Sequence, residues 1–446
     1  MRMMLVGAGA VGECILKVLK KRDPKGEWLE YVLITDYSRE RAEEVLEHLR
    51  AWPGSESKMA ENRAMFMDRR SQKKCTIYEE ACVDAHKKSE LVCLMKEHAI
   101  DFVMDAASPF VSNYIFDAAY EAGANYGSMG TWSVPKEHPE FGIGFEGSYL
   151  EPMTKYNFDR HEQWKKKGLT ACICLGIDPG VVNVFAKYAA EYLFDELWEV
   201  HVKDGGNLEE PGNRKDVIEF GFNVWTVLDE VMNPNAEWSL ENGFLIEDAF
   251  AGEEEFRMPE PYGINRLVKV EHEEVVTMPR YLSQYGLKKA SFKIALDDNL
   301  LNALKVINAL GLRSTKPIEV DGVKVIPRDV VAACAPQPKD IGAEMTGGMC
   351  VGVHCIGKKD GKRKECFIYQ PFDNEESVKT WGMQAVVAQT GFGAALGIEL
   401  LGKGIWKGAG VFSPEYFPSK PYMDLMKEAG LWYDIEERQV TGCGQD

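Results

Sequence analysis

The fold is decided by the amino-terminal stretch MRMMLVGAGAVGECILKVLKKR, residues 1–22. Residues 3–6 form a short apolar run, which predicts a buried strand. Gly7, Gly9 and Gly12 follow at once, and apolar residues then recur at helical spacing until a basic cluster that suits the end of a helix. A strand, a glycine turn and a helix in this order predict the phosphate-binding start of a dinucleotide-binding fold.

A second predicted strand, residues 31–35, ends in Asp36, which lies 24 residues beyond Gly12. An acidic residue at this place accepts hydrogen bonds from the ribose hydroxyls and repels a 2′-phosphate. Arg39 and Arg41 come slightly later and could either reach a phosphate or lie on a solvated helix face. We therefore predict NAD as the cofactor, with NADP possible. The residues predicted to hold it are Gly7, Gly9, Ala10, Val11, Gly12 and Asp36.

Outward from this segment, predicted strands and helices alternate. Strands are predicted at residues 76–83, 102–104, 125–127 and 170–175, and helices at residues 38–49, 89–98, 113–122 and 155–167. This alternation predicts an α/β fold with a Rossmann-type, doubly wound parallel sheet. Residues 52–74 interrupt the pattern and are interpreted as an insertion, and residues 133–147 as a loop.

The character of the chain changes after about residue 199. Longer alternating strands at residues 266–272 and 288–295, with acidic loops, predict an α+β substrate domain. After residue 373 the pattern becomes helical again. We expect a nucleotide domain at residues 1–198, a substrate and dimerisation domain at 199–375, and a helical segment at 376–446.

Composition narrows the functional class. The 446 residues include 52 Lys and Arg against 70 Asp and Glu, and the net charge of −18 argues against nucleic-acid binding. Eleven cysteines without a CxxC pair, and no continuous apolar leader, predict a cytoplasmic protein with free thiols. Residues 382–402 have membrane length but contain polar side chains, so we expect a core helix and no membrane partner. His138, His161 and His201 share no metal-ligand spacing, so no metal is expected.

Further motifs resemble a known family. These are Val83-Asp84-Ala85, Ala107-Ser108-Pro109 and Gly176-Ile177-Asp178-Pro179-Gly180. Taken in order, they resemble the saccharopine dehydrogenase-like family, which includes saccharopine reductases and carboxynorspermidine dehydrogenases. The resemblance extends over residues 3–434. It implies that Asp84, Ala107 and Ser108 contact the cofactor, and that the carboxy-terminal helices return to the nucleotide domain.

The resemblance implies hydride exchange at a C–N bond. The leading expectation is an NAD(P)-dependent oxidoreductase acting on the CH–NH bond of a small, amino-acid-derived secondary amine. The alternative is a carboxynorspermidine or carboxyspermidine dehydrogenase, with a polyamine-type substrate. A third possibility is a non-catalytic NAD-binding sensor or scaffold. The family's saccharopine reductases carry a Ser-Tyr pair where this chain has Ser128-Met129-Gly130-Thr131-Trp132, which leaves the substrate open and makes Thr131 a substrate-binding candidate. A homodimer is the default expectation.

Five other residues are candidates for the chemistry itself. Arg280, after a predicted strand and a proline, is the first candidate to bind a substrate carboxylate through its planar fork, and Arg266 is the second. His272 with Glu273 is the candidate acid/base pair, because histidine titrates near neutral pH and neighbouring strand residues face opposite sides. Asp178 follows a sheet strand and could contact substrate or orient water. The alternatives are structural ion pairs, a structural histidine and a simple Asp-Pro-Gly turn.

Overall fold

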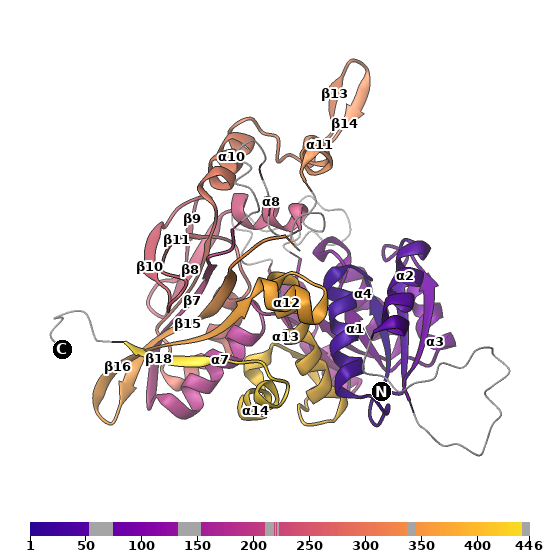
Figure 1. Ribbon diagram of the computed structural model, residues 1–446, viewed down its shortest axis with the longest axis horizontal. Helices are drawn as coiled ribbons and strands as arrows, with labels where there is room; N and C mark the ends of the chain where they lie inside the picture. Colours follow the sequence, from indigo (N-terminus) through magenta and orange to yellow (C-terminus); the bar gives the residue numbers. More distant parts are fainter. Residues whose placement is uncertain are drawn as a thin grey trace. The chain divides into compact units, whose positions relative to one another are not determined.

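A computed structural model describes residues 1–52, 75–132, 153–209, 218, 220, 223–336 and 344–438 (Figure 1). The chain divides into two compact units. The first contains Met1–Trp132, Lys155–Val181 and Gln389–Gly430, and the second is built mainly on Val182–Ala388. The predicted insertion and the predicted loop at 133–147 lie almost wholly outside the described residues. The domain boundaries predicted at residues 198/199 and 375/376 stay predictions.

The first unit is a seven-stranded parallel sheet in the order β17-β6-β5-β4-β1-β2-β3. Strand order reverses direction between β1 and β4, which is the point where doubly wound sheets bind ligands. The strands are β1 Arg2–Val6, β2 Tyr31–Asp36, β3 Ile77–Cys82, β4 Phe102–Asp105, β5 Asn125–Ser128, β6 Thr170–Cys172 and β17 Gly410–Phe412.

Helices connect these strands. They are α1 Ala10–Arg22, α2 Arg39–Ala51, α3 Lys88–Glu97, α4 Pro109–Ala122, α5 Lys155–Phe158, α6 His161–Lys166 and α14 Lys420–Glu428. Local sequence explains their ends. The Ser38 hydroxyl accepts a hydrogen bond from the Arg41 amide at the start of α2, and Gly123, with φ +83°, ends α4 in the left-handed conformation.

The long helix α13, Ala385–Gly402, belongs to the first unit from residue 389 onward. Its length and composition would allow it to cross a membrane, but 78% of the apolar window is buried inside the fold. Close packing explains its glycines. A Cβ at Gly391 would lie 2.6 Å from the Cys14 sulfur, and one at Gly393 would lie 2.1 Å from the Gly176 carbonyl oxygen. The return of the carboxy-terminal helices to the nucleotide fold is confirmed.

The second unit is a nine-stranded, mixed sheet with flanking helices. Its strands are β7 Glu196–Gly206, β8 Asn235–Ser239, β9 Gly243–Glu247, β10 Glu254–Arg257, β11 Ile264–Lys269, β12 Lys289–Ala295, β15 Gly348–Lys359, β16 Lys362–Asp373 and β18 Asp434–Arg438. Its helices are α7 Val181–Tyr188, α8 Val224–Met232, α9 Glu274–Leu282, α10 Asp298–Ala309, α11 Pro327–Cys334 and α12 Asn374–Trp381. A separate hairpin joins β13 Ile318–Val320 to β14 Val323–Val325. The predicted α/β class with an α+β second domain is confirmed.

Several predicted element bounds are wrong. The helix predicted over 155–167 is two short helices, α5 and α6. The sixth strand ends at Cys172 rather than residue 175, because the chain turns at Cys174, whose φ is +67°. The strand predicted over 266–272 is β11, which ends at Lys269. Among the described residues, ten cysteines are free thiols.

Candidate functional site

Three glycines shape the loop between β1 and α1, each for a different reason. Gly7 has φ +98°, and a Cβ there would lie 2.6 Å from the Ala106 backbone. A Cβ at Gly12 would lie 2.2 Å from the Gly7 carbonyl oxygen, so this glycine allows the helix to approach the strand. A Cβ at Gly9 would meet nothing within 4 Å. The loop is therefore tightly packed at its two ends and open in its middle.

The open middle of the loop lies at the amino terminus of α1, where the helix begins with Ala10 and Val11. Among the residues that the structure describes, no side chain caps this end of the 13-residue helix. Helix N–H groups without an intrahelical partner, together with the helix dipole, favour an anion. The open space at Gly9 and these amides fit the pyrophosphate of a dinucleotide.

Asp36 and Arg41 hold the same loop from the side of β2. The Ala8 amide donates to Asp36 Oδ2 at 2.8 Å, and the Ser38 amide donates to Asp36 Oδ1 at 3.0 Å. Arg41 Nε donates to the Ala8 carbonyl oxygen at 2.7 Å, and its Nη2 donates to Glu13 Oε2 at 2.7 Å. The Arg41 guanidinium therefore donates to the loop and to α1. From the sequence alone, this side chain could have contacted either a phosphate or solvent.

Glu13 is buried beneath this contact. Burial would raise the pKa of Glu13, but Lys17, His48 and Arg41 outweigh it and hold the pKa below its usual value. The carboxylate therefore stays charged and keeps Arg41 paired. Nothing in the sequence pattern pointed to this network except the position of an acidic residue in the first turn of the helix.

Other predicted cofactor residues lie at the same edge of the sheet. The Val83 amide, next to Asp84, donates to the Asp36 carbonyl oxygen at 2.9 Å. Hydrogen bonds from the His86 side chain and backbone hold the pKa of Asp84 below its usual value. Ala107 and Ser108 follow β4, and the Gly7 loop packs against the first of them. The predicted residues that follow β1 to β4 thus share the carboxyl edge of the sheet, with the glycine loop and Ala107 at the reversal point and Asp84 at the outer strand β3.

Sequence reasoning missed Asp105, which ends β4 directly below this loop. It accepts from the Ala107 amide at 3.0 Å and from the Tyr126 hydroxyl at 2.8 Å. Burial raises the pKa of Asp105 to about 6, although these donors and Ser112 oppose the shift. The signal that could have revealed it is an acidic residue at the end of a fully apolar strand.

Asp178 and Thr131 also belong to the first unit. The Gly176 amide donates to the Pro179 carbonyl oxygen at 2.7 Å, and the Val181 amide donates to the Gly176 carbonyl oxygen at 3.1 Å. This tight turn places Asp178, half-buried, beyond the sixth strand. The Leu175 amide donates to the Ser128 carbonyl oxygen at 2.8 Å, so the turn lies next to the end of β5, after which the buried Thr131 follows.

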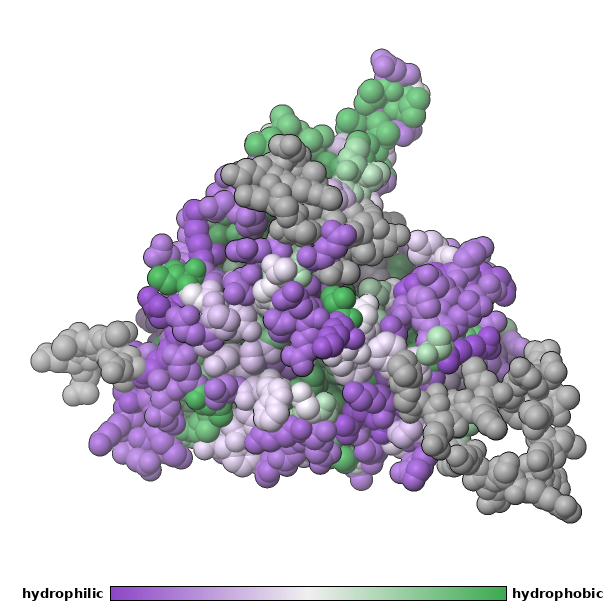
Figure 2. Space-filling model, viewed as in Figure 1, coloured by the Kyte–Doolittle hydropathy of each residue, from purple (hydrophilic) through white to green (hydrophobic). Residues whose placement is uncertain are grey.

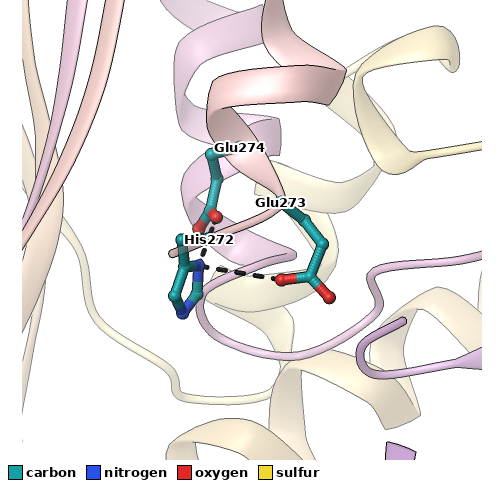
Figure 3. Close-up of side chains that lie close together, drawn as sticks. All are labelled: His272, Glu273 and Glu274. Carbon is teal, nitrogen blue, oxygen red and sulfur yellow. Dashed lines mark hydrogen bonds and ion pairs between the residues drawn. The ribbon is translucent and has the colours of Figure 1, made fainter. Parts of the chain in front are cut away.

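In the second unit, His272 lies in the connection between β11 and α9 (Figure 3). This corrects the prediction that it lies on a strand with its neighbours on opposite faces. Its ring stacks on Phe292 at 3.7 Å between centroids, and His272 Nδ1 lies 2.5 Å from Glu274 Oε2 and 3.9 Å from Glu273 Oε2. Glu273 directly precedes α9 and Glu274 is its first residue, and both carboxylates approach the same imidazole nitrogen (Figure 3).

The glutamates around His272 favour the protonated form of its imidazole. Burial by itself would lower the pKa of His272, but Glu274, then Glu230 and Glu273, raise it well above its usual value. Three glutamate side chains thus act together on the imidazole of His272. Glu271, also buried, accepts from Asn233 Nδ2 at 2.8 Å.

Glu274 has an unused acceptor. Its side chain is 1% exposed, and no described residue donates to its Oε1. The ligand atoms of His272, Glu273 and Glu274 lie within 4.8 Å of one another, a spacing that could also hold a metal ion. The consecutive residues His272, Glu273 and Glu274 were the signal for this cluster in the sequence, which the spacing of histidines and cysteines alone does not reveal. The expectation of no metal stays a prediction.

The two arginine candidates lie elsewhere in the second unit. Arg280 is in the last turn of α9, with Pro279 inside that helix, and so does not follow a strand as predicted. It is exposed. Arg266 lies on β11 and forms ion pairs with Glu253 at 2.6 Å and Asp298 at 3.2 Å, all at the surface. The substrate-binding roles of both arginines stay predictions.

Two family models match the chain, one directly after the other. The model described as saccharopine dehydrogenase NADP binding domain matches residues 3–172, and the model described as saccharopine dehydrogenase C-terminal domain matches residues 176–431. An apo saccharopine dehydrogenase (L-Glu forming) from Saccharomyces cerevisiae shares the fold, with a TM-score of 0.64 and 12% identity, covering 98% of this chain and all of that one.

Three curated relatives are similar in sequence over most of their length. A carboxynorspermidine synthase from Vibrio alginolyticus is 30% identical over 80% of this chain and 83% of the relative. One from Vibrio cholerae is 27% identical over 98% of this chain and 97% of the relative. A carboxyaminopropylagmatine dehydrogenase from a Synechocystis species is 27% identical over 80% of this chain and 84% of the relative. With both family domains matched in order, the chain belongs to the saccharopine dehydrogenase family and is an NAD(P)-dependent oxidoreductase acting on CH–NH bonds.

Proposed function

We propose that this enzyme reduces the C=N bond formed between a polyamine-type diamine and an aldehyde of amino-acid origin, as a carboxynorspermidine synthase would. Condensation releases water, and addition of a hydride and a proton then yields a secondary amine. The similarity over 80–98% of this chain to relatives named carboxynorspermidine synthase and carboxyaminopropylagmatine dehydrogenase supports this reading over the saccharopine reaction.

The observation that carries the proposal is the buried acidic cluster of His272, Glu273 and Glu274. An ammonium group can donate to several oxygens at once, and the unused Glu274 Oε1 offers such an acceptor. His272 Nδ1 already lies at hydrogen-bond distance from Glu274, so an imidazolium there disfavours a metal ion at that nitrogen. A substrate made of carboxylates would instead be repelled, because like charges interact strongly away from water.

The remaining roles follow from chemistry. A reduced nicotinamide dinucleotide, when bound, supplies the hydride. The loop residues Gly7 to Gly12, with Asp36, Asp84, Ala107 and Ser108, hold the dinucleotide. His272 holds a proton at Nδ1 that Glu274 keeps in place, and Asp178 orients the reacting nitrogen or water, near Thr131. Arg280, with Arg266 as the second candidate, binds the carboxylate of the carbonyl partner.

Glu273→Gln tests the amine site, because it removes a charge and keeps the shape. We expect the KM for 1,3-diaminopropane to rise roughly tenfold or more, the loss of about one charge-assisted hydrogen bond. The KM for propylamine, which lacks the second ammonium, should change little. Glu255→Gln, an exposed acid on β10, is the matched control. Equal losses for both amines would contradict the proposal.

Two alternatives are kept. A saccharopine-type enzyme would turn over lysine with 2-oxoglutarate instead, and a non-catalytic NAD-binding sensor would turn over neither pair. We also propose that the enzyme works in the cytoplasm, which fits the free thiols of the described cysteines. A homodimer is proposed as its assembly.

A further inference from the structure

Tyr37 directly follows β2, at the carboxyl edge of the parallel sheet and next to Asp36. Its side chain is 83% exposed, which is the largest exposed fraction among the large hydrophobic side chains that the structure describes. Within those residues, no ring, cation or hydrogen-bond partner contacts the phenol. A large aromatic ring therefore stands open to solvent beside the residue proposed to bind the ribose of the cofactor.

The backbone that carries this ring is held on both sides. The Cys82 thiol donates to the Tyr37 carbonyl oxygen at 3.3 Å, and the Ser38 amide donates to Asp36 Oδ1 at 3.0 Å. Asp36 pairs with Cys82 in the register of β2 and β3, and the Val83 amide donates to the Asp36 carbonyl oxygen at 2.9 Å. Because a tyrosine side chain has only two main torsions, a ring on such a fixed backbone loses little entropy when a ligand packs on it.

The surface around Tyr37 is polar. Helix α2, which begins two residues later, presents Arg39, Glu40, Glu43 and Glu47 to solvent. Figure 2 shows a mainly hydrophilic surface over this helix. A protein or membrane contact is marked by a contiguous apolar patch, so a single aromatic ring in polar surroundings fits a small planar ligand better.

The covalent structure of a dinucleotide indicates which of its groups reaches Tyr37. In the proposed placement, the pyrophosphate lies at the amino terminus of α1, after β1, and the adenosine ribose lies at Asp36, after β2. Strands β1, β2 and β3 are neighbours in this order. The adenine is bonded to the ribose carbon next to the one that carries the 2′-hydroxyl, so it continues past Asp36 toward the edge where Tyr37 and Cys82 meet.

We propose that the ring of Tyr37 stacks on the adenine of the bound dinucleotide. Stacking needs a flat π surface and no particular hydrogen bond, so tyrosine supplies it without a charge. A neutral ring interacts alike with the adenine of NAD and of NADP, whereas the Asp36 carboxylate opposes only the 2′-phosphate. Tyr37 therefore sets how tightly the base is held, and Asp36 sets which cofactor is preferred. The stacking rests on the proposed function only through the placement of the dinucleotide, and not through the identity of the amine.

Isothermal titration calorimetry of the full chain with NADH tests the stacking. We expect Tyr37→Ala to raise the Kd for NADH roughly tenfold or more, through the loss of one base–aromatic stack, and to raise the Kd for NADPH by the same factor. Tyr37→Phe keeps the ring and removes the hydroxyl, so it should bind NADH like the unmodified chain. Tyr192→Ala, at a 47% exposed tyrosine of the second unit, is the matched control and should bind NADH normally.

Reduced nicotinamide mononucleotide, which lacks the adenosine half, distinguishes a lost stack from a distorted loop. Its affinity should be the same for the unmodified chain and for Tyr37→Ala, and the exposed position of Tyr37 means that both variants should keep the melting temperature of the unmodified chain. The stacking is overturned if Tyr37→Ala binds NADH normally, if Tyr37→Phe is as weak as Tyr37→Ala, or if the mononucleotide is weakened as much as NADH. Where Asp36→Ser still weakens NADH and Tyr37→Ala does not, the stacking fails while the proposed cofactor site stands.

Discussion

The carboxylate of Asp36 holds the glycine loop, and we propose that it also binds the ribose of the cofactor. The Ala8 amide donates to one of its oxygens, so the residue is part of the loop's own structure. Arg41, the residue that could have received a 2′-phosphate, is paired with Glu13 and the Ala8 carbonyl. The position of Asp36 and the pairing of Arg41 both favour NAD over NADP. Arg39, which is exposed at the start of α2, is the nearby residue that could favour NADP.

We predict that the charge of Asp36 makes the enzyme prefer NAD to NADP. Two like charges about 4 Å apart at an effective dielectric near 20 cost about 4 kcal/mol before screening, and half of that gives NAD a preference of roughly tenfold or more. Asp36→Ser should narrow the gap by weakening NAD and admitting NADP. Asp36→Asn keeps an acceptor for the Ala8 amide and so separates charge from loop structure. Fluorescence titration with each cofactor measures this preference. If the unmodified chain binds NADPH more tightly than NADH, the prediction is wrong.

His272 gives a second prediction, about stability and pH. Its pKa is raised on folding by Glu274, so the pair stabilises the fold fully below the unfolded value near 6.5 and loses this effect as pH rises through the folded value. Glu274→Gln should cost about 1–3 kcal/mol of unfolding free energy at pH 7. Urea unfolding at neutral and alkaline pH should show the difference between the two proteins shrinking as pH rises. A pH-independent difference would mean that His272 is neutral.

At the scale of elements, the glycine loop and α1 were predictable because three constraints coincide within twelve residues. A strand needs an apolar run, a tight approach needs glycine, and a helix needs its own period. The second unit was harder. The run before α9 alternates like a strand, but it is a buried connection, and its acidic residues face one histidine from a helix amino terminus. Periodicity cannot distinguish a strand from an extended connection, so it misplaced both His272 and Arg280.

The loop glycines allow a paired prediction. Gly9→Ala places a methyl group where nothing lies within 4 Å, so the fold should survive while the methyl blocks the dinucleotide. Gly12→Ala places a Cβ 2.2 Å from the Gly7 carbonyl oxygen, so it should lower thermal stability as well. Differential scanning fluorimetry with and without NADH distinguishes a loss of cofactor binding in Gly9→Ala from a loss of stability in Gly12→Ala. Normal cofactor binding by a folded Gly9→Ala variant would show that the loop does not hold the dinucleotide.

At the scale of the whole molecule, sequence was sufficient for the fold class and the family but not for the acidic cluster. The family motifs are local and survive in order, whereas the convergence of Glu230 and Glu274 on His272 joins α8 to α9 through tertiary packing. The same is true of the hairpin of β13 and β14, whose apolar face follows from its register rather than from composition. Features made by distant segments are those that a single sequence does not specify.

The central claim, reductive coupling of a diamine, is tested most directly by nicotinamide absorbance with the purified full chain. We predict that NADH or NADPH is consumed when 1,3-diaminopropane and aspartate semialdehyde are added together, and that neither compound alone has this effect. Mass spectrometry of the product should give the sum of the two partners, less water and plus two hydrogens. Turnover of lysine with 2-oxoglutarate in place of that pair, or of neither pair, would contradict the account.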